Sequence, residues 1–199
     1  MLSSISPLGE RARASRWWVT TTAYLIGSLA GGLALGGLAG VLGSLVPEGW
    51  RGSPLSLGVL AALLAVGLVL DIRSGGHALP SWRRQVDEQW LTRYRGWVYG
   101  VGFGAQLGFG VVTIVTSSTT YAAVLLAVLG GSPAAGLLIG GVFGVVRAVP
   151  SLLLARVHDR EQLHKVFKRV ENWANPADVL AKVAVAAGAA ALTVAALGS

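Results

Sequence analysis

The chain has 199 residues, of which 53% are hydrophobic and only 13% are charged, a composition typical of a polytopic membrane protein and too apolar for a soluble domain. It contains no cysteine, which excludes disulfides, thiolate metal sites and thiol redox relays within this sequence. The net charge of +7 is confined to segments between apolar runs. It therefore indicates membrane orientation and contact with anionic lipid, and argues against nucleic-acid binding.

Two membrane-spanning helices are predicted in the first half of the chain. One apolar run extends from Trp17 to about Leu45 and a second from Pro54 to Ile72, close to or above the roughly 20 residues that a hydrocarbon core requires. The first run follows three arginines and is too long for the apolar part of a cleavable signal peptide, so none is expected. In the polar segment 82–95, apolar residues recur every four positions, which predicts an amphipathic helix in the membrane interface.

A broken helix is predicted at the start of the second half. The apolar region from Trp97 to Leu129 is too long for one straight crossing, and the TSSTT run at 116–120 interrupts it. Hydroxyl side chains can bond the backbone groups that a break leaves free, so we expect kinked or non-helical backbone within 115–121.

The rest of the chain predicts two further apolar helices joined by a basic segment. Pro133 to Arg156 forms a span, and the segment after it is amphipathic and basic, so we expect a second helix in the interface. Asn175 and Pro176 end that helix, and Asp178 caps an extra C-terminal helix over 178–198.

The chain forms a single membrane domain, 1–199, and an internal repeat is predicted within it. The two copies are residues 17–96 and 97–177: at an offset of 79, Trp18 aligns with Trp97, and the turn Gly-Ser-Pro at 52–54 aligns with the same three residues at 131–133. Each copy ends in a basic amphipathic segment. The alternative is two similar hairpins without duplication.

Basic residues predict the orientation. The N-terminal tail and the loops at 73–95 and 156–169 hold most of the arginine and lysine, which places all three in the cytoplasm. The chain then crosses the membrane twice between residues 95 and 156, with part of 116–130 bent or re-entrant, which gives five spans in all. An additional crossing at 119–130 would give the alternative of six spans. We therefore expect an all-α, polytopic protein of the bacterial inner membrane with five, or alternatively six, transmembrane helices and two interfacial amphipathic helices.

Polar residues at membrane depth gather in the second half, and Arg147 is the most unusual of them. It lies about 21 Å into the helix that begins at Pro133, at about 1.5 Å per residue. A charge near the middle of a span costs roughly 3 kcal/mol on insertion scales, so we expect Arg147 to face the protein interior and bind an oxygen. The candidate substrate path consists of Gln106, Thr113, Thr116, Ser117 and Arg147. The alternative is that Arg147 snorkels and the hydroxyls bond their own helix.

Basic residues of the amphipathic segments are candidates for contact with anionic lipid head groups: Arg83, Arg84, Lys165, Lys168 and Arg169. No metal or other cofactor is expected, because the three histidines lie in polar loops with no carboxylate at membrane depth beside them. Paired acids, a nucleophile with a base and a phosphate loop are also lacking in the sequence, so an enzyme is not expected.

The stretch from Gly100 to Arg156 resembles the transmembrane domain of CcdA and DsbD, in the LysE-like transporter superfamily. GVGFGAQLGFGVVTIVT is similar to the family's broken helix, and GLLIGGVFGVVRAVPSLLLA to its span with the pattern G-x-x-F/Y-x-x-G-x-x-x-P. The family's pair of membrane cysteines is missing here. The resemblance therefore implies a shared scaffold or a solute-moving relative, without the redox chemistry. The family's internal repeat is inverted, whereas the repeat predicted for this chain is parallel.

The leading functional hypothesis is a small transporter-like protein that moves or binds a small solute, an anionic one being favoured by Arg147. The alternative is a non-catalytic accessory or assembly subunit of a larger bacterial membrane complex. Flat glycine and alanine faces and little extramembrane mass suit that role. The expected partners are membrane lipids and either further copies of the chain or other membrane subunits.

Overall fold

The computed structural model describes residues 7, 10, 16–74, 94–110, 118–157 and 159–198, and within these ranges the regular structure is entirely helical. Four helices are long and apolar enough to cross a membrane: Trp17–Ser44, Pro54–Arg73, Pro133–Ala155 and Glu161–Gly198. A helix pairs its backbone N–H and C=O groups internally, which a membrane span requires because lipid tails offer no hydrogen-bond partners. The all-α membrane fold is therefore confirmed at this level of detail.

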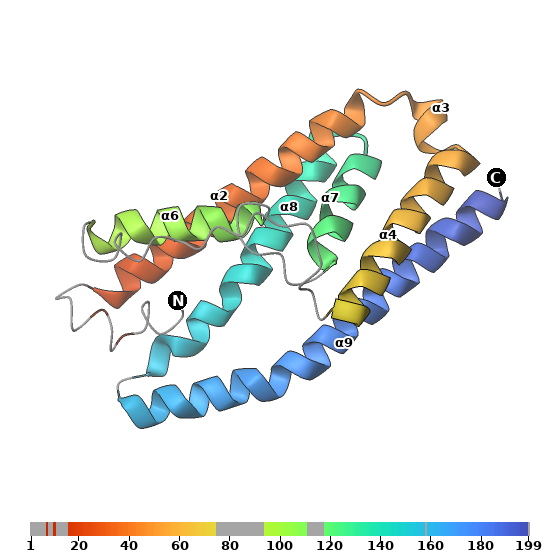
Figure 1. Ribbon diagram of the computed structural model, residues 1–199. Coiled ribbons are helices and arrows are strands. Elements are labelled where there is room, and N and C mark those ends of the chain that lie inside the picture. Colours follow the sequence, from red (N-terminus) through yellow and green to blue (C-terminus); the bar gives the residue numbers. More distant parts are fainter. Residues whose placement is uncertain are drawn as a thin grey trace.

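Helix α2 (Trp17–Ser44) lies at the centre and packs through glycine on two neighbours, α6 (Gly96–Phe109) and α8 (Pro133–Ala148) (Figure 1). A Cβ added to Gly36 would lie 2.1 Å from the carbonyl oxygen of Gly136, a distance that real Cβ atoms do not reach. Only glycine lets the two backbones touch in this way. This contact offsets the conformational entropy that glycine costs in a helix.

The region from 97 to 129 contains two separate helices, and the break predicted within 115–121 lies partly outside the described residues. Helix α6 ends at Phe109, and α7 (Thr119–Leu129) begins after residues 111–117, which lie outside the described residues. Their 14 and 11 residues correspond to about 21 Å and 17 Å, and neither spans a core about 30 Å thick.

The two short helices run in the same direction along α2. The start of α6 contacts the start of α2, since a Cβ on Gly100 would lie 2.6 Å from the carbonyl oxygen of Thr20. The end of α7 contacts the end of α2, where a Cβ on Gly43 would lie 2.0 Å from that of Val128. Together α6 and α7 therefore accompany α2 over most of its length.

Helix α8 begins at the expected proline and changes its winding near its end. The Ser132 hydroxyl accepts a hydrogen bond from the Ala135 N–H at 3.2 Å and so caps the helix, with Pro133 at the first helical position. After Ala148 the chain continues as a 3-10 helix, η1 (Val149–Arg156). Pro150 cannot donate a backbone hydrogen bond, which is the local reason for the change.

The remaining helices form the other part of the molecule. A single turn, α3 (Glu48–Arg51), leads into α4 (Pro54–Ser74), which packs against the second half of α9 (Arg160–Gly198) and runs in the opposite direction (Figure 1). Many large hydrophobic side chains of α4 and α9 are exposed in the isolated chain. Such faces require lipid or another membrane protein as their surroundings.

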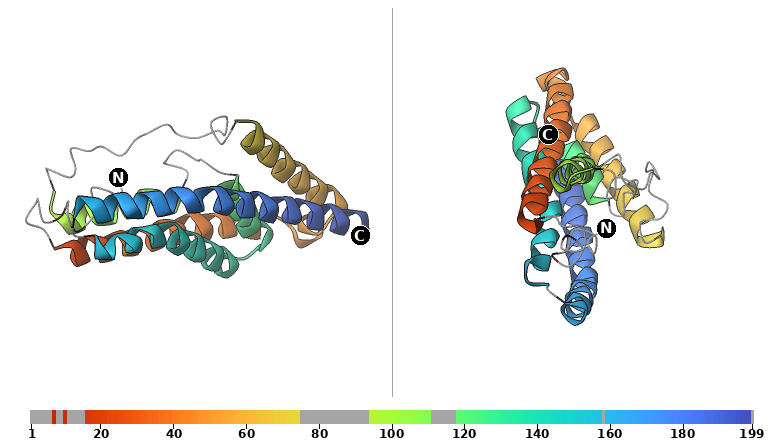
Figure 2. Two further views of the ribbon diagram at one scale, coloured as in Figure 1. Left: turned by 90° about the horizontal axis from the view of Figure 1, so that it is seen from below. Right: turned by 90° about the vertical axis from the view of Figure 1, so that its left-hand side faces the viewer.

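The course of α9 corrects the prediction for the C-terminal region. We expected an interfacial helix ending at Pro176 and a separate last helix capped by Asp178, but α9 is one helix of 39 residues. It extends along almost the whole length of the molecule in Figure 2 and changes direction in Figure 1. Proline inside a helix usually bends it rather than ending it when neighbouring turns hold. Asp178 instead pairs with Lys182 one turn later, at 2.6 Å.

Candidate functional site

Arg147 extends from α8 to the start of α7, next to the break. Its Nη1 donates a hydrogen bond to Thr120 Oγ1 at 3.3 Å, and its guanidinium carbon lies 5.2 Å from the centre of the Phe143 ring. The side chain is half-buried, and the Tyr24 hydroxyl of α2 lies within electrostatic reach of it. The oxygen partner expected for Arg147 is thus the Thr120 hydroxyl.

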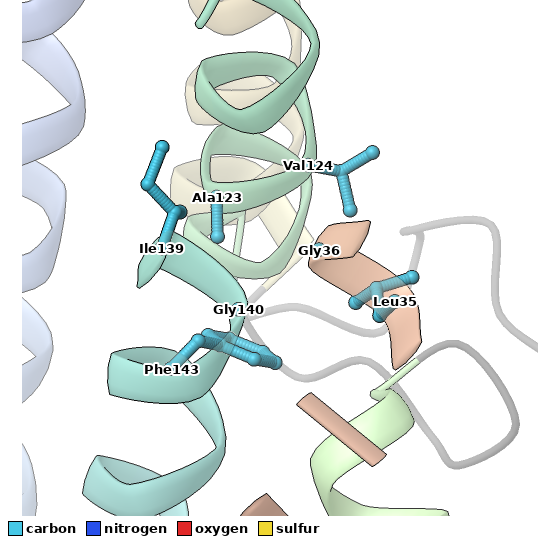
Figure 3. Close-up of a pocket in the computed structure, with 7 residues that line it drawn as sticks. All are labelled: Leu35, Gly36, Ala123, Val124, Ile139, Gly140 and Phe143. Atoms are coloured by element: carbon cyan, nitrogen blue, oxygen red, sulfur yellow. The ribbon is translucent and has the colours of Figure 1, made fainter. Parts of the chain in front are cut away.

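Gly110, the last described residue before the break, packs against side chains of α7 and α8. Gly110 ends α6 with a φ of 66°, and a Cβ there would lie 3.2 Å from both the Phe143 ring and the Thr120 methyl group. The adjoining cavity, between α2, α7 and α8, has a volume of about 10 Å³ (Figure 3). A single water needs roughly 10–15 Å³, so this space does not form a route for a solute.

Asp71 of α4 contributes a second charged group at the break. Its carboxylate is buried, with 1% of the residue exposed, and Oδ2 accepts hydrogen bonds from the Ser118 N–H at 2.8 Å and the Ser118 hydroxyl at 2.9 Å. Ser118 is the N-cap of α7, where backbone N–H groups and the helix dipole favour a negative charge. The carboxylate therefore serves as a cap for α7 that α4 supplies.

We expected no carboxylate at membrane depth and did not identify Asp71 as a partner of Ser118 from the sequence. The sequence does carry a signal for it, since Asp71 stands inside the run LVLDIR, where the apolar character of α4 still continues. Asp71 lies one residue before the end of the apolar run predicted from Pro54 to Ile72, and we gave it no role from the sequence alone. Its burial depends on the packing of α4 against Ser118, which periodicity alone does not reveal.

Helix α9 adds an ion pair on the same side of the molecule. Lys182 and Asp178 lie one turn apart, and Lys182 also interacts electrostatically with Asp71. The N-terminal ends of α2 and α6 are joined by a further buried acid, Glu10. Its carboxylate accepts hydrogen bonds from the Thr20 hydroxyl at 2.9 Å and from the Tyr99 hydroxyl.

Of the candidate path residues, the structure describes Gln106 and Arg147. Gln106 is half-buried on α6, and its backbone carbonyl accepts a hydrogen bond from the Gly110 N–H at 3.3 Å. Thr113, Thr116 and Ser117 lie outside the described residues. Arg147 is therefore brought together with Thr120, Phe143 and Gly110.

Among the candidate lipid contacts, the described basic residues all lie on exposed parts of α9: Lys165, Lys168 and Arg169. Lys165 forms an ion pair with Glu161 at 2.7 Å, which an exposed position makes weak. Arg83 and Arg84, with the rest of the first interfacial segment, lie outside the described residues. Contact with anionic lipid remains a prediction for all five. In the described part of the chain, no three His, Asp or Glu side chains are grouped as a metal site would require.

Comparison with known proteins gives one consistent group of relatives. No protein-family model matches the chain, and no solved structure matches it significantly. The methylamine utilization protein MauF of Methylorubrum extorquens is 32% identical over 206 aligned residues, which cover 98% of this chain and 68% of that protein. The MauF of Paracoccus versutus is 30% identical over 157 residues, covering 75% of this chain and 55% of that one.

The MauF of Paracoccus denitrificans is 32% identical over 157 residues, or 75% of this chain and 54% of that protein. The chain thus spans about half the length of the Paracoccus relatives that it matches. The resemblance to the CcdA and DsbD transmembrane domain and the internal repeat both remain predictions.

Proposed function

The chain belongs to the MauF family of methylamine utilization proteins, and on that premise we propose that it is a non-catalytic accessory protein of a bacterial methylamine utilization system. The observation that carries the proposal is the 32% identity to the Methylorubrum protein across 98% of the chain. An accessory protein of this kind acts by associating with another membrane component of the same system. The exposed apolar faces of α4 and α9 are compatible with such association.

The transporter hypothesis was wrong. The relatives of this chain are named for methylamine utilization, which favours the accessory alternative. The tightly packed surroundings of Arg147 support the same correction, because its guanidinium is held by Thr120 and Phe143 beside a cavity of only about 10 Å³. Arg147 then has a structural role, as a link between α7 and α8.

We further propose five crossings of the bacterial inner membrane. Helices α2, α4 and α9 each make one, α8 with η1 makes another, and α6 with α7 makes one interrupted crossing. This assignment follows the common direction of α6 and α7 along α2. It keeps the three basic segments on the cytoplasmic side, with the N-terminus there as well.

The test is deletion of the gene in a bacterium that grows on methylamine. We expect growth on methylamine to stop, growth on another carbon source to continue, and an intact copy to restore growth. Raising external methylamine a hundredfold should not rescue the deletion, because the missing protein is not a route for methylamine. Normal growth of the deletion strain would overturn the proposal. Rescue by high methylamine would also overturn it, because it would indicate that the protein transports methylamine.

A further inference from the structure

A second, larger cavity lies away from the break, at the opposite end of α7. It has a volume of about 270 Å³ and lies between α3, α4 and the last turn of α7. Its walls are formed by large apolar side chains: Trp50, Leu55, Val59, Leu60, Val128 and Leu129. The volume is near the lower end of the roughly 300–1,000 Å³ that ligand pockets have, and the lining suits a hydrocarbon chain.

Arg51 adds a positive charge to the wall of this cavity. Its side chain is only 20% exposed, and its buried Nε–H has no hydrogen-bond partner among the described residues. The Glu48 carboxylate lies 3.8 Å from Nη2 on a side chain that is 95% exposed, so this pair is weak. The cation is therefore held in place without a strong anionic partner from the described chain.

Gly131 explains why the guanidinium can sit there. This glycine has a φ of 59°, and a Cβ on it would lie 1.1 Å from Arg51 Nη1. The turn between α7 and α8 therefore leaves the space that the guanidinium fills. Arg51 is fixed by the fold rather than free to follow any solvent anion.

Arg51 lies beside the ends of two apolar helices, where a lipid head group would be expected. Close to Arg51 in the fold, α4 begins at Pro54 and α7 ends at Leu129, and the cavity extends from there along the apolar side of α4. Ends of membrane helices lie at the boundary between hydrocarbon and head groups. A cation at this boundary, next to an apolar cavity, complements a phospholipid, in which an anionic phosphate is joined to apolar acyl chains.

We propose that the cavity is a phospholipid site, in which one acyl chain lies against Leu55, Val59 and Val128 and the phosphate binds the Arg51 guanidinium. Arginine binds phosphate oxygens through charge-assisted hydrogen bonds, and the partly exposed Arg51 guanidinium has only the weak contact with Glu48 as an anionic partner among the described residues. The site does not depend on the proposed accessory function. It differs from the five basic residues of the amphipathic segments, which would contact head groups only at the surface.

Native mass spectrometry and thermal unfolding of the full chain in mild detergent test the proposal. After removal of lipid, added phosphatidylglycerol should raise the unfolding temperature of the wild type, because a ligand that binds only the folded state stabilises it. An equal concentration of inorganic phosphate should have no effect. Retention of phospholipid should fall at least tenfold in Arg51→Gln, which loses the charge, and in Val59→Trp, which fills the cavity.

Matched controls lie on the same helix. Arg73→Gln removes an exposed arginine at the other end of α4, and Val66→Trp adds a ring at a position as exposed as Val59 (57% against 52%) but away from the cavity. Both should retain lipid as the wild type does. The proposal fails if lipid does not stabilise the wild type, if phosphate alone stabilises it equally, or if all four variants bind lipid alike. Retention of another protein in place of lipid, lost in Val59→Trp, would assign the cavity to a partner subunit.

Discussion

The carboxylate of Asp71 accepts two hydrogen bonds from Ser118, one from its backbone N–H at 2.8 Å and one from its hydroxyl at 2.9 Å. The two residues belong to different helices, so α4 supplies the N-terminal cap of α7. In the five-crossing topology that we propose, α7 starts within the membrane, where water would not satisfy its first N–H groups. The contact therefore links the broken helix to the part of the molecule formed by α4 and α9.

Replacing Asp71 with alanine should destabilise the folded protein strongly. The change removes two hydrogen bonds to a charged acceptor, each worth about 1.5–3 kcal/mol, and leaves the α7 N-terminus without its cap. We expect a loss of about 3 kcal/mol or more in the free energy of unfolding, measured by titration with a denaturing detergent. Asp71→Asn should lose less, because its amide oxygen can still accept both bonds.

A matched control for this prediction is provided by Asp159. Its carboxylate accepts a hydrogen bond from the Gln162 N–H at 2.7 Å near the start of α9, and the residue is exposed. Asp159→Ala should therefore cost only about 0.5–2 kcal/mol, as exposed caps do. Equal losses in Asp71→Ala and Asp159→Ala would show that burial of the Asp71 carboxylate has no energetic weight.

Glycine in the α2–α8 contact should not tolerate even a methyl group. A Cβ on Gly140 would lie 2.1 Å from the Gly32 carbonyl oxygen, so Gly140→Ala must push the two helices apart. Overpacking of this kind costs about 1–3 kcal/mol, and we expect the upper end because backbone atoms cannot move aside. The measurement is the free energy of unfolding in detergent.

Gly188 of α9 is the internal comparison, because a Cβ there would meet no atom within 4 Å. Gly188→Ala should leave stability unchanged or raise it by about 0.5–1 kcal/mol, since alanine costs less entropy in a helix. If both substitutions have the same effect, the close approach of α2 and α8 is not what requires glycine at position 140.

Patterns along the chain predicted the elements that depend on local composition. The runs from Trp17 and Pro54 and the proline start of α8 follow from apolar length and helix-breaking residues, and the structure confirms them. The course of α9 could not be predicted in this way. Pro176 is a stop signal in isolation, but here the helix continues through it.

The contacts of the break depended on information that no local pattern carries. Arg147 was recognised by its cost in the membrane, yet its partner Thr120 is 27 residues away, and the register of α7 against α8 decides which oxygen it meets. Asp71 and Ser118 are separated by 47 residues. The flat glycine faces are visible in the sequence, but several pairings of the glycine rows are compatible with them.

The link between Arg147 and Thr120 should appear as a coupling energy in a double-mutant cycle. Arg147→Met keeps the length of the side chain and removes the charge, and Thr120→Val keeps the shape and removes the hydroxyl. We expect a coupling of about 1–2 kcal/mol in the free energy of unfolding, as for a hydrogen bond from a charged donor. Both variants should still insert into the membrane.

The same cycle separates a structural role of Arg147 from snorkelling. In the accessory role that we propose, Arg147→Met should also weaken growth on methylamine by loosening α7 against α8. If the two changes in the free energy of unfolding add within about 0.3–0.5 kcal/mol, the hydrogen bond contributes nothing and Arg147 only snorkels toward the membrane surface.

The orientation of the five crossings that we propose can be measured directly, because the chain has no cysteine of its own. Gln162→Cys stands at the exposed start of α9, and His77→Cys stands in the basic segment 73–95, which the sequence predicts to be cytoplasmic. A membrane-impermeant thiol reagent should label both only after the cytoplasmic side is opened, since basic segments stay inside. Gly49→Cys, where a side chain meets no atom within 4 Å, should be labelled in intact cells. Labelling of residue 162 from outside, with residue 77 still protected, would establish an odd number of crossings between them and favour six spans over five.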